Sequence, residues 1–476
     1  MRRLLLILGQ CGALAACSFA PRYSTPTPPS PPPAQFQEEW KTSAPADADS
    51  RGEWWKVFQD PTLDALEGRV TTANQNIKAA FARLQQARAE TRVQRSFLFP
   101  TLTAGPNVTR SRTSLNSPTY NPTRPATGND FTLEADLSYE IDVWGRIRNS
   151  VASARATEQA TAADLATLDL STHAELATDY FTLCGQDTQV ALLDQTVADY
   201  AHAVALTRSL FEGGAAARGD LDQAEAQLET ARTQARDMRL KRAQTEHAIA
   251  VLVGESPSTF HLDSRQLRPD AAPPAVEPGL PSVLLERRPD VAGAERRTAA
   301  ANADIGVARA AYFPVFTLGG AGGFESTRTG NWIDAPSNFW SIGPSAVLTV
   351  FDAGRHRAQS AQAHARYDEL VATYRETVLT AYQEVEDNLA ASRDLEAEAV
   401  SQAAAVAATG SALRQAQFQY QGGIVTYLQV VVTENAALSA QLTAADIQIR
   451  RMSAAVLLIK ALGGGWSSPS SGALPR

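Results

Sequence analysis

Two stretches of the chain alternate apolar and polar side chains with a period of two. Residues 131–143 place apolar side chains at odd positions and polar ones at even positions, and residues 340–350 show a similar alternation. This period predicts strands that each have one apolar face. Because another strand is expected to precede each of them, we predict two β-hairpins, at residues 100–144 and 314–353.

Seven-residue spacing of apolar side chains marks the first of two long tracts without proline, 146–212 and 355–421. The spaced residues are Leu176, Leu183, Val190, Val197, Val204 and Phe211. Such a repeat predicts helices that supercoil against neighbouring helices. At 1.5 Å per residue each tract would be roughly 100 Å long. A shorter helix is expected from Asp60-Pro61 to Phe99, where Pro100 disfavours continuation.

The chain contains an internal duplication. Phe99-Pro100 recurs as Phe313-Pro314, an offset of 214 (314 minus 100), and the offset falls to 209 for later motifs. An offset that changes only between motifs places the insertions in loops. Each repeat is predicted to contain a helix, a β-hairpin and a long helical hairpin. The predicted divisions are a signal peptide at 1–16, an anchored segment at 17–53, repeats at 54–270 and 271–465, and a flexible tail at 466–476.

The N-terminal residues resemble a lipoprotein signal. Arg2-Arg3 precede an apolar stretch, and Leu14-Ala15-Ala16-Cys17 resembles a lipobox, which predicts cleavage before Cys17 and lipid attachment to it. Ser18 in place of Asp favours sorting to the outer membrane. The Pro-rich residues that follow predict an extended tether.

Charge and hydropathy narrow the possible compartments and partners. The net charge of -8 on 476 residues gives no basic footprint for nucleic acid. No apolar run of 18 residues follows the signal, so a membrane crossing is expected as strands. Four strands cannot close a barrel, and in lipid an open edge costs several kcal/mol per unpaired backbone group. Other copies must complete it, with eight strands in a dimer or twelve in a trimer.

Acidic side chains lie on the polar face of the first alternating stretch. They are Glu134, Asp136, Glu140 and Asp142. In a shared barrel these residues would line a wet lumen. In a soluble hairpin they would form only a charged outer face.

A glycine pair follows each long tract, Gly213-Gly214 in the first repeat and Gly422-Gly423 in the second. Glycine at this place stops a helix with a left-handed residue. Asp220 with Gln223, and Thr426 with Gln429, fit a capping box that starts the returning helix. We therefore expect two helical hairpin tips, which could dock a partner or constrict a channel.

The sequence gives little support for catalytic activity. The six histidines are scattered, and HExxH, CxxC and GxSxG motifs do not occur. We expect neither an enzyme nor a cofactor or metal.

Several longer motifs resemble one known family, the NodT-type lipoprotein branch of the outer-membrane efflux proteins related to TolC and OprM. The motifs are LPSVLLERRPDV at 280–291, IGVARAAYFP at 305–314, Asp60-Pro61-Thr62-Leu63, Trp144-Gly145-Arg146, and Phe351-Asp352-Ala353-Gly354-Arg355. The resemblance covers nearly the whole mature chain.

The resemblance implies an α+β membrane protein in which three protomers form a twelve-stranded β-barrel continued by a long periplasmic α-helical barrel. It implies an outer-membrane exit duct for small molecules such as drugs. Its partners would be a periplasmic adaptor (membrane fusion) protein and a proton-driven inner-membrane RND transporter, which supplies the energy.

Family members close the periplasmic mouth with acidic side chains on the last helical hairpin, but Val432 stands where relatives often carry Asp. The resemblance leaves Asp220, Asp222 and Tyr427 as candidates for gating and adaptor contact at the tips. Two other functions stay open, a type I secretion duct for proteins and a trimeric coiled-coil surface protein. Strands in both repeats favour a channel over a coiled-coil stalk.

Overall fold

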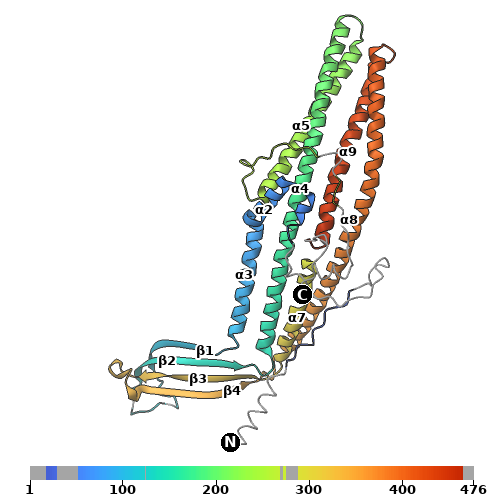
Figure 1. Ribbon diagram of the computed structural model, residues 1–476. Coiled ribbons are helices and arrows are strands. Elements are labelled where there is room, and N and C mark those ends of the chain that lie inside the picture. Colours follow the sequence, from blue (N-terminus) through green and yellow to red (C-terminus); the bar gives the residue numbers. More distant parts are fainter. Residues whose placement is uncertain are drawn as a thin grey trace. The chain divides into compact units, whose positions relative to one another are not determined.

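The computed structural model describes residues 18–28, 52–118, 120–123, 125–267, 272–274 and 288–464. The described chain twice follows the order helix, two strands, long helix and returning helix (Figure 1). The first series is η1 (Trp54–Phe58), α2 (Pro61–Ala73), α3 (Gln75–Ser96), β1 (Thr101–Arg112), β2 (Thr127–Ile141), α4 (Arg146–Glu212) and α5 (Arg218–Leu252). The second is α7 (Pro289–Ala310), β3 (Val315–Ser326), η2 (Thr329–Asn331), η3 (Ala335–Ser337), β4 (Asn338–Val347), α8 (Arg355–Gln421) and α9 (Tyr427–Ala461).

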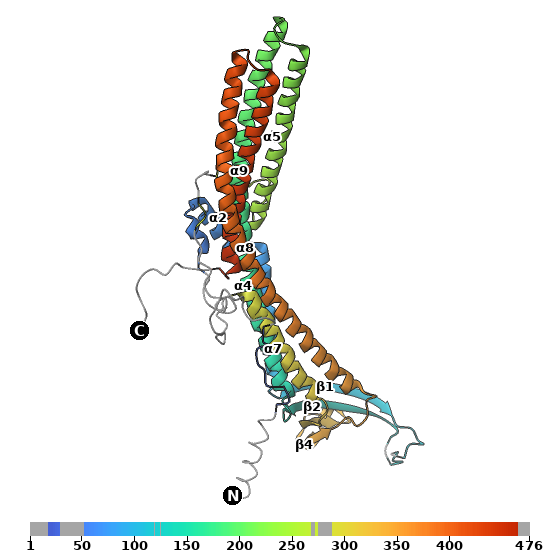
Figure 2. The same cartoon turned by 90° about the vertical axis from the view of Figure 1, so that its right-hand side faces the viewer.

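The four strands form one antiparallel sheet in the order β1-β2-β3-β4 (Figures 1 and 2). β1 pairs with β2 and β3 pairs with β4, which confirms the two predicted hairpins. β2 also pairs with β3, from Phe131 opposite Ser326 to Ile141 opposite Phe316, and this pairing joins the two repeats. β1 and β4 are therefore the edges of the sheet.

β4 is shorter than the alternation predicts. It ends at Val347, which lies opposite Val315, the first residue of β3. Since β3 starts there, residues 348–350 have no partner strand within the described chain, and Val350 is 91% exposed. Alternation marks a face that suits a sheet, but pairing decides where a strand ends.

The two long helices match their predicted bounds, because α4 and α8 each have 67 residues and cover 146–212 and 355–421. The expected helix from Pro61 to Phe99 is wrong at Asn74, where the chain forms two helices. The Oδ1 atom of Asn74 accepts hydrogen bonds from the backbone N–H groups of Asn76 (2.9 Å) and Ile77 (3.1 Å). Asn74 therefore ends α2 and caps the start of α3.

The chain divides into two compact units, and several helices contribute to both. Unit 1 contains residues 1–28, 83–162 and 293–376, which include the sheet. Unit 2 contains residues 29–82, 163–292 and 377–476. None of the described helices combines the length and the hydropathy needed to cross a membrane.

The main core of unit 2 joins both repeats. Its fully buried side chains include Leu63 of α2, Leu176 of α4, Ile249 of α5 and Val456 of α9. Burial of each such side chain contributes roughly 1.5–3 kcal/mol. A satellite core at the hairpin tips contains residues of α4, α5, α8 and α9.

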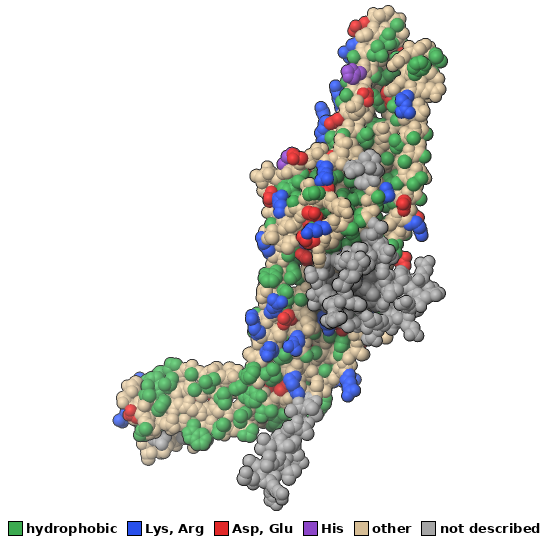
Figure 3. All heavy atoms as spheres, in the orientation of Figure 1, with side chains coloured by type: hydrophobic (Ala, Val, Ile, Leu, Met, Phe, Trp, Pro, Cys, Tyr) green, Lys and Arg blue, Asp and Glu red, His purple; other side chains and the backbone are tan. Residues whose placement is uncertain are grey.

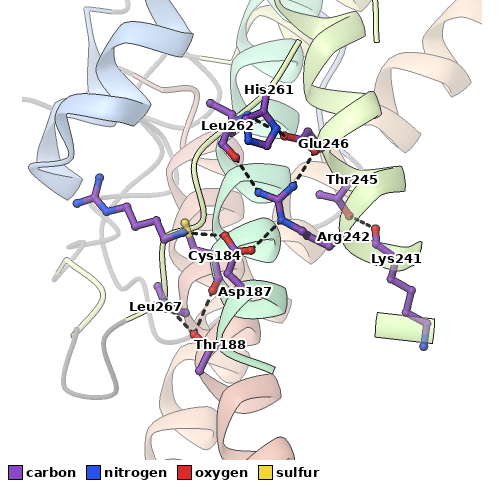
Figure 4. Close-up of polar contacts among 11 residues, drawn as sticks. Cys184, Asp187, Thr188, Lys241, Arg242, Thr245, Glu246, His261, Leu262 and Leu267 are labelled. Carbon is purple, nitrogen blue, oxygen red and sulfur yellow. Dashed lines mark hydrogen bonds and ion pairs between the residues drawn. The ribbon is translucent and has the colours of Figure 1, made fainter. Parts of the chain in front are cut away.

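The segment after α5 is fastened to the helices by Arg242 (Figure 4). Its guanidinium donates to Asp187 of α4 at 2.8 Å, to Glu246 of α5 at 2.7 Å and to the carbonyl oxygen of Leu262 at 2.8 Å. The Glu246 carboxylate in turn accepts from the backbone N–H of Leu262 at 2.7 Å. Charge-assisted hydrogen bonds thus hold this segment in addition to the packing of Phe260, Leu262 and Leu267 at the core of unit 2.

The N-terminal segment differs from its prediction in one respect. Residues 18–28 are extended, but they pack against the helices of unit 1, for example through a 2.8 Å hydrogen bond from Asn302 to the carbonyl oxygen of Pro21. The interpretation as a free tether is therefore wrong for these residues. Proline content predicted the extended backbone, whereas docking depends on side chains of α7 that are distant in sequence.

Candidate functional site

The sheet has two chemically different faces. On one face, Asp136 of β2 lies between Thr103 of β1 and Ala321 of β3, and Glu134 lies between two glycines. The opposite face carries large apolar side chains of the edge strands that are mostly exposed. They are Leu102 (68%), Val108 (61%), Trp340 (75%) and Ile342 (65%).

This distribution follows from the pairing register, because side chains directly opposite each other on paired strands point to the same face. Figure 3 shows hydrophobic side chains spread along the sheet of unit 1. A contiguous exposed apolar surface marks a membrane or protein contact. With unpaired edges at β1 and β4, such a sheet is suited to lipid only after its edges are closed.

The structure places the four predicted lumen acids in different surroundings. Glu134 and Asp136 lie within β2 on the polar face. Glu140 also lies in β2, and its carboxylate pairs with Arg146 at 2.6 Å. Asp142 lies beyond the end of β2, so its assignment to the strand is wrong.

Asp142 instead holds the start of α4. Its carboxylate accepts hydrogen bonds from the backbone N–H groups of Ile147 (3.1 Å) and Arg148 (2.9 Å). It also pairs with the Arg148 guanidinium at 3.1 Å. An anion is favourable at a helix N-terminus, where the N–H groups lack intrahelical partners.

The two glycine pairs form the same turn at the two hairpin tips. Gly214 and Gly423 have φ of +74° and +72°, a left-handed conformation that favours glycine. The next residues donate back to the helix, Ala215 N–H to Leu210 and Ile424 N–H to Gln419, at 2.8 and 2.9 Å. The prediction that these pairs end the long helices is confirmed.

The returning helices start differently from the predicted capping boxes. α5 begins at Arg218, and its N-cap is Ala217 rather than Asp220. The Asp220 carboxylate reaches back to the backbone N–H of Ala217 at 3.4 Å. Thr426 is the N-cap of α9, but its side chain makes no capping hydrogen bond. The observed N-cap of α5 therefore lies three residues before the predicted one, because α5 starts about one turn earlier than expected.

The other tip residues are also placed. Asp222 pairs with Arg218 at 2.8 Å, and both side chains are more than half exposed. Tyr427 is 5% exposed and lies against Tyr420, with ring centroids 5.6 Å apart. Its surroundings are the satellite core at the tips. A gating or adaptor role for these residues stays a prediction.

The two tips differ in charge, a feature that motif analysis missed although a count of charged residues would have found it. Residues 206–224 at the first tip contain three acidic and two basic side chains. The equivalent residues 415–433 at the second tip contain none. The second tip instead exposes large apolar side chains. They are Phe418 (76%), Ile424 (73%), Leu428 (53%) and Val432 (54%).

The predicted lipid attachment residue, Cys17, lies outside the described residues. So do the signal peptide, most of the Pro-rich segment, part of the linker between the repeats, and the tail.

Comparisons with known proteins give consistent results. Residues 68–255 and 280–464 match the family model of the outer membrane efflux proteins. The chain is 32% identical over 470 residues to the outer membrane protein OprJ of Pseudomonas aeruginosa, covering 96% of this chain and 95% of that protein. It is 30% identical to OpmQ of the same organism, a pyoverdine export outer membrane protein, with 98% of both chains covered.

Solved structures of outer-membrane channels are similar over most of the chain. The channel OprN matches with a TM-score of 0.83 at 30% identity, covering 94% of this chain and all of that chain. The open state of the MtrE channel of Neisseria gonorrhoeae matches with a TM-score of 0.80 at 25% identity, covering 94% of this chain and 98% of that chain.

Proposed function

Because the chain belongs to the outer membrane efflux protein family, we propose that three copies of it form one exit duct of a tripartite efflux pump. The chain is an outer-membrane efflux channel by family and by fold. The observation that supports a barrel shared between copies is the sheet, with its exposed apolar face and its two edges, β1 and β4.

In hydrocarbon an unpaired edge is too costly to persist, so β1 of one copy pairs with β4 of the next copy. Three copies contribute twelve strands, and barrels larger than eight strands leave room for an aqueous lumen. The polar face with Glu134 and Asp136 then lines the lumen, and the face with Trp340 and Ile342 contacts lipid.

The transported compounds are proposed to be small molecules. One relative, TtgF of Pseudomonas putida, is named for toluene efflux and is 31% identical, and OpmQ is named for pyoverdine export. The duct itself is a passive conduit. We propose that a periplasmic adaptor joins it to an inner-membrane RND transporter, and that this transporter selects the substrate and supplies the energy.

The oligomer and its conductance test this proposal together. Light scattering of the purified full chain should give the mass of three copies, and the same sample should form discrete conductance steps in planar bilayers. A sample dissociated by heat serves as the control and should not conduct. A monomer that stays folded in detergent would contradict the shared barrel.

The tip acids are proposed to narrow the periplasmic mouth. Asp220 and Asp222 are the accessible candidates, because Tyr427 is buried. Asp220→Ala and Asp222→Ala should each raise single-channel conductance. The matched control is Glu229→Ala, an exposed acid on the same helix that pairs with Arg232. Equal conductance in all four proteins would remove both aspartates as a gate.

Cys17 is proposed to carry the lipid that holds each copy at the outer membrane. Cys17→Ala should abolish palmitate labelling. Cys184→Ala should keep the label, because Cys184 is buried in the core of unit 2. Label retained by Cys17→Ala would refute the anchor.

A further inference from the structure

Residues 18–28 follow a defined path over unit 1. The Tyr23 hydroxyl donates to the Glu295 carboxylate of α7 at 2.7 Å. Asn302 of α7 donates to the Pro21 carbonyl oxygen at 2.8 Å, and Arg375 of α8 donates to the Thr27 carbonyl oxygen at 3.2 Å. The segment is thus held along its length by side chains of two helices.

The start of this segment meets the root of the sheet. The ring of Phe19 stacks on Phe313, with centroids 4.5 Å apart and planes 5° apart, and it lies 5.9 Å from Trp144. Trp144 also lies 4.8 Å from Phe313, and its indole N–H donates to the carbonyl oxygen of Pro314 at 2.8 Å. Three rings from three chain segments therefore meet where β2 ends and β3 begins. Stacked aromatic pairs contribute about 0.5–1.5 kcal/mol beyond their buried area.

This arrangement explains two motifs that channel function alone does not use. Trp144 belongs to the Trp-Gly-Arg motif, and Phe313 belongs to the second Phe-Pro motif. Each motif supplies one of the two aromatic rings that Phe19 packs against.

Gly306 of α7 leaves room for residues 18–28, because it has no side chain. A Cβ atom there would lie 2.8 Å from the backbone nitrogen of Ala20 and 2.4 Å from Nδ2 of Asn149. Asn149 in turn accepts a 3.0 Å hydrogen bond from the Ser18 hydroxyl. A larger residue at position 306 would push the segment away from α7 and α4.

The internal duplication provides a comparison within one chain. At the offset of 214, the first-repeat equivalents of Gly306 and Phe313 are Arg92 and Phe99. Arg92 would fill the place that Gly306 leaves open, and Phe99 is 68% exposed. Residues 18–28 therefore pack at the second of the two related positions.

We propose that residues 18–28 are a strap that fixes the root of the sheet to α4, α7 and α8, and that Phe19 is its positioning residue. The strap closes over the junction of strand and helix in each copy. The first residue of the strap, Ser18, directly follows Cys17 in the sequence, the residue proposed to carry the lipid.

Hydrogen exchange of the full-length purified oligomer tests the strap. In Phe19→Ala, amides at 142–147, 313 and 315–318 should exchange at least about tenfold faster, because local opening becomes easier by about 1.4 kcal/mol. Phe99→Ala is the matched control, which removes an exposed ring at the equivalent motif and should leave these amides unchanged. Phe19→Trp should retain the protection, because it retains a ring.

A second variant covers the case in which Phe19→Ala does not assemble. Gly306→Ala keeps Phe19 but obstructs the segment, and it should raise exchange at the same amides. Replacing residues 18–28 with a Gly/Ser segment of equal length should do the same, and a synthetic peptide of residues 18–28 should restore protection in trans.

Two results would overturn the strap. One is exchange in Phe19→Ala and Gly306→Ala equal to that of the wild type. The other is faster exchange only in molecules that have lost the palmitate label, which would assign the effect to the anchor. Trimer mass and conductance are measured on the same samples, so failure of the proposed channel function is recognised separately.

Discussion

Asn74 and Arg288 occupy equivalent positions in the two repeats, and each donates a hydrogen bond to the last turn of the returning helix in its own repeat. Nδ2 of Asn74 donates to the carbonyl oxygen of Leu252 at 2.8 Å. Nη1 of Arg288 donates to that of Ala461 at 3.1 Å. Both pairs follow the offsets of the duplication, 214 for the donors (288 minus 74) and 209 for the acceptors (461 minus 252). The same contact, a side-chain hydrogen bond to the last carbonyl group of the returning helix, is thus made by two different side chains.

Removing the contact made by Arg288 should destabilise the fold more than removing the contact made by Asn74. Arg288 is 6% exposed and also pairs with Asp290 at 2.6 Å and Glu384 at 2.7 Å. Removing one partner of a buried ion pair costs roughly 3–5 kcal/mol, and the 39% exposure of Glu384 favours the lower end. Arg288→Ala should therefore lower the thermal midpoint, measured by circular dichroism, more than Asn74→Ala does. Equal shifts would mean that the ion pairs add nothing to the shared hydrogen bond.

The single glycines of the two long helices should respond oppositely to alanine. A Cβ at Gly185 of α4 would lie 2.1 Å from Cγ1 of Ile449 in α9, whereas the nearest atom to one at Gly410 of α8 is 3.6 Å away. Gly185→Ala should cost about 1–3 kcal/mol through overpacking. Gly410→Ala should gain up to about 1 kcal/mol from helix propensity. Thermal unfolding of both variants measures this, and Ile449→Ala should rescue Gly185→Ala.

Adjacent residues of β4 should tolerate lysine very differently. Ile342 lies on the apolar face of the sheet, and Ser341 lies on the polar face opposite Ala321 and in line with Asp136. A lysine facing lipid costs about 2–4 kcal/mol near the bilayer centre. Ile342→Lys should reduce the amount of heat-resistant oligomer in outer-membrane fractions, and Ser341→Lys should not. The reverse order would exchange the assignments of the two faces.

The buried pair of His173 and Glu67 predicts lower stability at alkaline pH. Nδ1 of His173 lies 2.5 Å from the Glu67 carboxylate, and Trp55 stacks on the imidazole. Burial alone would lower the pKa of His173, but hydrogen bonds with Asp169 and Glu67 outweigh it and raise the pKa to about 9. The stabilisation is complete below the unfolded pKa near 6.5 and is lost as the pH rises through 9.

The loss is at most roughly 3–4 kcal/mol, because the pKa of His173 rises from 6.5 to about 9 on folding and one pKa unit corresponds to about 1.4 kcal/mol. Thermal midpoints between pH 6 and 10 should fall more steeply for the wild type than for His173→Gln. Parallel curves would show that this histidine does not gain its proton on folding.

Local signals predicted the elements of this fold better than their junctions. The period-two stretches identified β2 and β4, the expected hairpins supplied β1 and β3, and the proline-free tracts identified the two 67-residue helices, because pairing and burial there follow a regular spacing. The break at Asn74, the cap by Asp142 and the role of Gly185 were missed. Each depends on a partner that lies far away in sequence, or on where a helix begins.

The candidate sites show the same limit. Spacing placed Glu134 and Asp136 on the polar face, but it could not reveal that Tyr427 is buried or that Phe19 packs at the sheet root. The charge difference between the tips was visible in the sequence but belongs to no motif.

The charge difference between the two hairpin tips limits the symmetry with which a ring of partner subunits could bind to the tips of the proposed channel. In the proposed trimer, duplication would give six tips of two kinds, three with charged side chains at 206–224 and three without any at 415–433. A ring of six identical partner subunits would therefore meet two kinds of tip, one charged and one uncharged. The subunits of such a partner must either bind as three pairs, one pair to each copy of the channel, or contact the backbone, which both kinds of tip provide.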